Sequence, residues 1–165
     1  MLGMMLAGSV AACAYGGSGD PLPTAAGQSH RPAPSVPSKG PEILSTETRN
    51  YAELERRLSA ALGSVVLADA GPADGPGVGF RKAATVMTAG PHTVTAACVG
   101  ARHAQISLSQ ETKGGTEHMV FEVDCSEARS QVVQLQKGYV SARLTRHDPT
   151  GAWTGAVAGI RITVQ

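Results

Sequence analysis

Apolar residues change their spacing at Gly63, and this change divides the folded part of the chain. Before Gly63 they recur three or four positions apart, as on one face of an amphipathic helix. These apolar positions are Tyr51, Leu54, Leu58, Ala61 and Leu62. Asn50 and Glu53 resemble a capping box, Glu53 and Arg57 have the spacing of an ion pair on a helix surface, and Gly63 is typical of the position after a helix. The pattern predicts a helix over residues 50–62 that packs on the domain following it.

After Gly63, apolar and polar residues alternate, as in strands with one buried and one solvent-facing side. Clusters rich in Gly, Pro and Asp separate most of these segments, and the densest turn cluster covers residues 69–77. The alternating segments lie at residues 65–67, 78–87, 92–98, 106–108, 118–125, 133–135, 140–145 and 160–164. Short strands at intervals of about 8–12 residues are typical of a sandwich. The sequence therefore predicts an all-β fold, an antiparallel β-sandwich of about eight strands preceded by one short helix, with a core of small aliphatic side chains.

The first 44 residues have neither pattern. Residues 1–12 carry no charge and read as the apolar part of a signal peptide, and Val10-Ala11-Ala12-Cys13 resembles a bacterial lipobox. That resemblance implies cleavage before Cys13 and a lipid on its sulfur. Such signals begin with Lys or Arg, and the absence of both here leads us to expect a translational start further upstream. The alternative is a buried apolar segment with an incidental cysteine.

Residues 13–44 are rich in Gly, Ser, Pro, Ala and Thr and contain six of the ten prolines. Proline disfavours regular structure, and so polar a segment buries too little apolar surface to order itself. We therefore expect a lipidated Cys13 followed by a disordered tether over residues 13–44 and one folded domain over residues 45–165. The whole chain of 165 residues has a net charge of +1, which argues against nucleic-acid binding, and no apolar run is long enough to span a membrane.

Cys98 and Cys125 each end a run of residues that the alternation predicts to face inward. In an exported protein the compartment is oxidising, so we expect these two cysteines to form a disulfide. The alternative, a redox or metal pair, normally has the spacing Cys-x-x-Cys, which these residues lack. With Cys13 lipidated and the other two paired, the three cysteines of the chain are all assigned.

Three segments, residues 93–100, 123–125 and 151–158, resemble the C-terminal domain of uncharacterised small secreted lipoproteins of high-GC Gram-positive bacteria. The lipobox and the Pro-rich tether fit the same layout. The resemblance implies a disulfide-bonded β-sandwich on a lipid anchor. It implies no catalytic residue.

The sequence contains no strong motif for catalysis, metal binding or cofactor binding. The chain has no nucleophile motif, its five histidines lack the local spacing of metal ligands, and its Asp and Gly residues do not form a calcium loop or a dinucleotide fingerprint. We therefore expect no catalytic residue, no metal and no cofactor. Tyr139, Arg143 and Trp153 are candidate ligand contacts, because sugar-binding sandwiches present exposed aromatic rings beside polar donors. The alternatives are a core or edge-covering role for Trp153 and a solvated strand face for Arg143.

These features predict a lipid-anchored protein on the extracellular face of the cell membrane, with a non-catalytic domain that acts as a binding or accessory module. Its partners would be the membrane, through the N-terminal lipid, and a cell-wall glycan or an envelope protein, but no nucleic acid. One alternative is an assembly subunit that binds a partner protein through a strand edge. The third hypothesis is that the protein is a small hydrolase.

Overall fold

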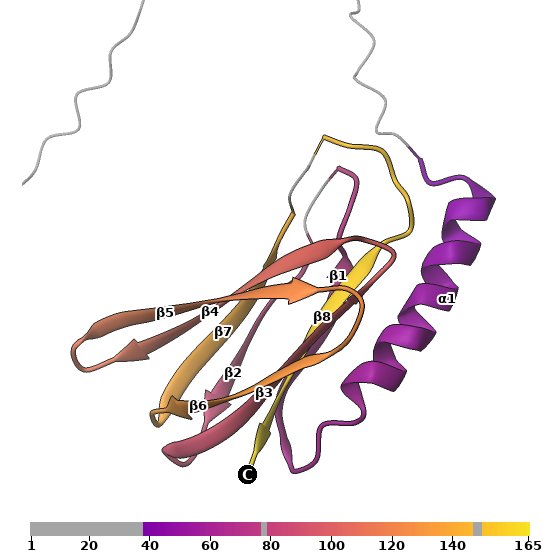
Figure 1. Ribbon diagram of the computed structural model, residues 1–165. Coiled ribbons are helices and arrows are strands. Elements are labelled where there is room, and N and C mark those ends of the chain that lie inside the picture. The colour runs from indigo at the N-terminus through magenta and orange to yellow at the C-terminus, as the bar shows by residue number, and fades with distance from the viewer. Residues whose placement is uncertain (1–37, 77–78, 147–149) are drawn as a thin grey trace, which may run out of the picture. The chain divides into compact units, whose positions relative to one another are not determined.

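The computed structural model describes residues 38–76, 79–146 and 150–165, in which one helix precedes eight strands (Figure 1). The helix is α1 (Pro41–Leu58). The strands are β1 (Val65–Pro72), β2 (Arg81–Val86), β3 (Gly90–Val99), β4 (His103–Thr112), β5 (Gly115–Asp124), β6 (Arg129–Leu135), β7 (Gly138–Thr145) and β8 (Val157–Val164). Each of the eight segments predicted from the alternation overlaps one of these strands.

The strands form two four-stranded antiparallel sheets with the orders β1-β8-β3-β6 and β2-β7-β4-β5. We call them the helix-side sheet and the opposite sheet. Aliphatic residues from both sheets fill the space between them, and Val94, Ile106, Leu108, Val140 and Ile162 are fully buried there. The predicted all-β antiparallel sandwich of about eight strands, preceded by a short helix, is confirmed, and so is its aliphatic core.

The predicted start and end of the helix are wrong. Helix α1 begins at Pro41, within the segment expected to be tether, and Gly40 is its N-cap. Proline suits the first helical position because its fixed φ is already helical and its missing N–H has no intrahelical partner there. Asn50 lies inside the helix, and its side chain donates a hydrogen bond to the carbonyl of Gly155 at 2.8 Å instead of capping. The helix ends at Leu58, so Gly63 does not follow it directly.

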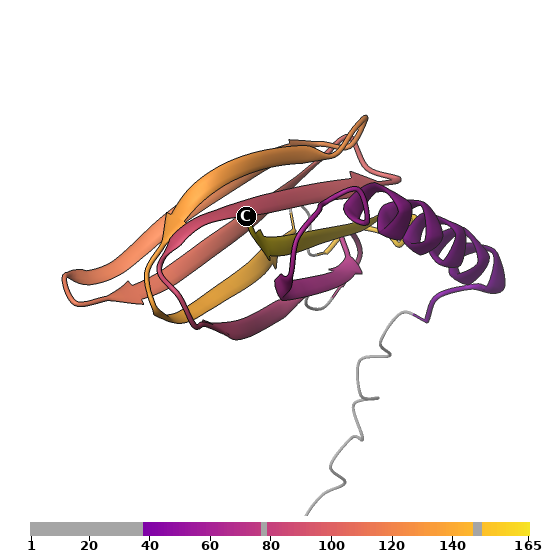
Figure 2. The same ribbon diagram turned by 90° about the horizontal axis from the view of Figure 1, so that it is seen from below.

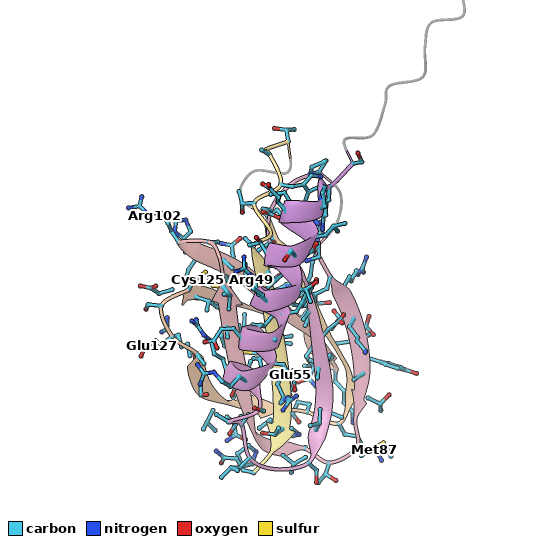
Figure 3. All side chains as sticks on the ribbon, turned by 90° about the vertical axis from the view of Figure 1, so that its right-hand side faces the viewer. Arg49, Glu55, Met87, Arg102, Cys125 and Glu127 are labelled. Atoms are coloured by element: carbon cyan, nitrogen blue, oxygen red, sulfur yellow. A yellow bond between two sulfur atoms is a disulfide. The ribbon has the colours of Figure 1, made fainter. Side chains whose placement is uncertain are left out.

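Helix α1 covers β3 and β8 of the helix-side sheet (Figures 1 and 2). Leu54 and Leu58 pack there on Ala97 and Val157, in a second buried cluster outside the sandwich core. Figure 3 views the molecule from this side, with α1 in front of the strands. The expectation of one solvent-facing side for each sheet is therefore wrong for β3 and β8, which α1 covers, whereas β6 of the same sheet keeps an exposed outer side. The described residues contain no helix that is long and apolar enough to cross a membrane.

The predicted turn over residues 69–77 begins too early. Asp69 to Pro72 continue β1 and pair with β8. Gly71 allows β1 to lie close to the segment before β2, since a Cβ atom there would lie 2.4 Å from the carbonyl oxygen of Gly79. Strand β2 begins at Arg81 rather than at residue 78, which lies outside the described residues.

Candidate functional site

Trp153, one of the three candidate ligand contacts, lies in the segment between β7 and β8 and is half-buried. The Nζ atom of Lys39 lies 4.1 Å from the centre of its ring, and the guanidinium carbon of Arg146 lies 5.6 Å away. Lys39 also forms an ion pair with Glu47 of α1 at 2.6 Å. On another side of the ring is Gly75, where a Cβ atom would lie only 2.2 Å from the indole. The ring is thus wedged between cations and backbone rather than presented as an open platform.

Asp74 holds the segment that carries Trp153. Its Oδ2 atom accepts hydrogen bonds from the backbone N–H and the hydroxyl of Thr154 and from the backbone N–H of Ala156. The side chain of Asn50 fixes the next carbonyl, that of Gly155. These contacts join α1, the segment after β1 and the segment before β8 at one end of the sandwich. The half-buried ring of Trp153 thus packs against the segments that meet at this end of the sandwich.

Burial shifts the pKa values of two groups near Trp153, Tyr51 and Arg146. The pKa of Tyr51 is raised, first because the phenol is partly buried and next because of the negative charge of Glu47. The pKa of Arg146 is lowered, mainly by burial, while Asp74 opposes that shift. Two cations, Lys39 and Arg146, and two anions, Glu47 and Asp74, thus interact in the surroundings of Trp153.

Tyr139 and Arg143 lie elsewhere, on the outer face of the opposite sheet. They are four residues apart on β7, and Ser141 between them points to the same side, because Val140, Ala142 and Leu144 point into the core. Tyr139 is 66% exposed, and Arg143 is also exposed. The structure brings Tyr139 and Arg143 onto one surface and places Trp153 in a different set of contacts.

Strand pairing adds further polar residues to this surface. Arg143 is opposite Arg81 of β2 on one side and Ser107 of β4 on the other. Ser141 is likewise opposite Ser109 of β4. We call this surface the serine face; it is lined by Arg81, Ala83, Ser107, Ser109, Glu111, His118, Tyr139, Ser141 and Arg143.

The serine face is hollowed along its centre. Two depressions of about 380 and 250 Å³ adjoin there, because they share Arg81, Ser109, His118 and Ser141. Small Ala and Ser side chains line the bottom of these depressions, whereas the longer side chains of Tyr139, Arg81 and Arg143 border them. Ser109 Oγ and His118 Nδ1 lie 2.8 Å apart, within hydrogen-bond distance. The face therefore offers hydroxyl groups, an imidazole, two guanidinium groups, one aromatic ring and the carboxylate of Glu111 to a ligand.

The disulfide between Cys98 and Cys125 is present and is confirmed. Cys98 lies in β3 and Cys125 follows β5, so the bond joins the helix-side sheet to the opposite sheet. Figure 3 shows Cys125 close to α1. From α1, Arg57 donates hydrogen bonds from one Nη atom to the carbonyls of both cysteines, at 3.0 and 2.7 Å, and it pairs with Glu53 as the spacing predicted. Arg57 is therefore half-buried and not on the outer side of the helix.

No family model, no curated protein and no solved structure matches this chain. The residues themselves carry the argument for function. Cys13, the predicted lipidation site, lies outside the described residues.

Sequence reasoning missed Arg81, His118 and the three serines of the serine face. A signal for Ser107 and Ser109 was present, because they alternate with the buried Ile106 and Leu108. The position of Arg81 opposite Arg143 has no such signal, since it depends on the pairing of β2 with β7, which the sequence does not reveal.

Proposed function

We propose that this protein is a non-catalytic binding module of the cell envelope, held at the extracellular face of the cell membrane by a lipid on Cys13, and that the serine face binds a glycan of the cell wall. One observation carries the proposal: the exposed ring of Tyr139 stands beside a hollow whose floor consists of small and hydroxyl-bearing side chains. A sugar ring presents C–H groups on its flat side and hydroxyls at its edge. An aromatic ring beside hydroxyl donors and acceptors matches both parts of it.

The position of the face supports the same proposal. Helix α1 covers part of the helix-side sheet and leaves the outer face of the opposite sheet to solvent. Tyr139 and Arg143, four residues apart on β7, are separated by about 13 Å along the strand. That length accommodates more than one sugar ring of a chain lying along β7.

Binding of the full chain to insoluble cell-wall glycan in a sedimentation assay tests the glycan site. Tyr139→Ala should reduce the affinity about tenfold, in the range found for aromatic residues at the centre of binding sites. Val132→Ala is the matched control, because Val132 is also exposed, at 51%, but lies on β6 of the helix-side sheet. Equal affinities of the two variants would reject the serine face as the site.

The lipid anchor has a separate test. Mass spectrometry of the mature N-terminus should find Cys13 as the first residue, with acyl chains attached. Two or three acyl chains give stable attachment, whereas one chain alone is marginal. An unmodified Cys13 would reject the anchor without affecting the glycan proposal.

A second candidate, protein binding through a strand edge, has one observation in its favour. Strand β5 forms one edge of the opposite sheet and carries Val120, which is 59% exposed. The same strand also carries Glu117, Glu122 and Asp124, and charged side chains are a common way to protect edges from pairing. We therefore favour the serine face over the edge of β5.

A further inference from the structure

Two arginines face each other at one border of the serine face. Arg81 of β2 and Arg143 of β7 are direct partners in the antiparallel pair, and both side chains are exposed. Like charges directly opposite each other destabilise a strand pair. Within residues 38–76, 79–146 and 150–165, no ion pair includes either arginine. The sheet therefore carries an uncompensated pair of guanidinium groups beside the hollow.

The carboxylates of this sheet face lie too far away to compensate them. Glu122 is on β5, two strands from Arg143, and at about 4.8 Å between strands this alone separates them by roughly 10 Å. The carboxylate of Glu122 also accepts a hydrogen bond from Gln105. Glu111 follows Ser107 by four residues on β4, about 13 Å along the strand from the point opposite Arg143. Positive charge is thus concentrated at the border formed by β2 and β7.

We propose that the ligand of the serine face is an acidic polysaccharide, and that Arg81 and Arg143 together bind a carboxylate carried by one of its sugar rings. This inference rests on the glycan-binding function proposed above and names the class of glycan. A guanidinium group presents paired N–H donors that match a carboxylate, and two such groups on neighbouring strands can bind one carboxylate from both sides. The repulsion between the arginines would then be relieved by the ligand.

The neighbouring residues favour a carboxylated sugar chain over a phosphate polymer. Tyr139 lies about 13 Å further along β7 and offers a ring face, which a sugar ring can cover and a bare phosphate chain cannot. The hydroxyls of Ser109 and Ser141, between the two ends of the hollow, suit the hydroxyl groups of a sugar. One chain along β7 would therefore meet the aromatic ring, the hydroxyls and the arginine pair in turn.

Two soluble probes of the same backbone test the inference: polygalacturonate and its fully methyl-esterified form, which lacks the charges. Isothermal titration of the full chain should give at least tenfold tighter binding of the acid than of the ester, with an advantage that shrinks as salt is added. Arg81→Gln and Arg143→Gln should each weaken binding of the acid about tenfold and weaken binding of the ester by a clearly smaller factor. Tyr139→Ala should weaken binding of both probes.

Lys82→Gln is the matched control, because it removes the same charge from the same strand while its backbone position alternates to the other side of the sheet, opposite the buried Ala142. A loss of acid binding in Lys82→Gln equal to that in the arginine variants would overturn the inference in favour of general charge attraction. Equal binding of acid and ester, with Tyr139→Ala weakening both, would overturn the inference and leave the glycan function standing. Tighter binding of inorganic polyphosphate than of polygalacturonate would overturn the choice of a carboxylated sugar. Binding of neither probe, together with no sedimentation on cell-wall glycan, would reject both proposals.

Discussion

Removal of the disulfide should destabilise the domain by an amount that the chain length between the cysteines sets. Cys98 and Cys125 are 27 residues apart in sequence. In the chain-entropy model, a cross-link of that length removes unfolded-state freedom worth about 3.5 kcal/mol at 25 °C. Small domains have a total stability of about 5–15 kcal/mol, so this loss is large but leaves a folded majority in most of that range.

The native contacts near the disulfide support a value close to the entropic one. Arg57 holds the carbonyls of Cys98 and Cys125 through two hydrogen bonds, neither of which involves a sulfur atom. Cys98 is fully buried and Cys125 nearly so, which limits relaxation of the sheets. We therefore expect the folded structure to change little, and the loss to come from the unfolded chain.

Urea denaturation of the full chain, followed by the emission of its single tryptophan, measures the effect. The unfolding free energy should fall by about 3.5 kcal/mol in the reduced wild type. Reduced wild type retains both sulfur atoms, so comparison with Cys98→Ala/Cys125→Ala separates the cross-link from lost packing. A fall of less than about 1 kcal/mol in both samples would refute the reasoning, because it would mean that the disulfide does not restrict the unfolded chain as the model requires.

The sequence was sufficient to predict strands because each has a local signature. Alternation places Val140, Ala142 and Leu144 on the inner side of β7, and Gly138, which has a φ of 141°, marks the turn before it. The same alternation places Tyr139 and Arg143 together on the outer side. Residues on one strand could thus be assigned to one face without knowledge of the fold.

The local signature at the start of α1 is ambiguous, because Pro41 suits a first helical position but also continues the Pro-rich segment before it. Residues 41–49 contain few apolar positions, and Glu47 is buried where Lys39 forms an ion pair with it beside Trp153. The motif formed by Asn50 and Glu53 suggested a later start, although both residues lie inside the helix. Contacts between distant parts of the chain thus determine where this helix begins.

The order of the strands in each sheet also could not be predicted from the sequence. Strand β2 pairs with β7, and β7 with β4, although long segments separate them. Only this order places Arg81 and Ser107 on either side of Arg143, and Ser109 next to Ser141. A surface assembled from four strands therefore became visible from the structure, whereas Tyr139 and Arg143 of β7 could be predicted to share one side of a strand.

Two further predictions concern α1 and the segment that carries Trp153. Hydrogen bonds from Arg56 and then Arg57 lower the pKa of Glu53 from 4.5 to about 2, so its carboxylate stabilises the domain above pH 4.5 and this contribution is lost as the pH falls toward 2. Glu53→Gln should therefore flatten the decrease in unfolding free energy across that pH range in urea titrations, and an unchanged decrease would contradict the assignment. Asp74→Ala removes the acceptor of three hydrogen bonds from Thr154 and Ala156, which should cost about 1–3 kcal/mol of stability and shift the emission of Trp153 to the red as water reaches the ring. Asp74→Asn retains one oxygen acceptor and should show a smaller shift; if both variants keep wild-type emission and stability, then the carboxylate of Asp74 does not hold this segment, and the packing of Trp153 between Lys39 and Gly75 suffices.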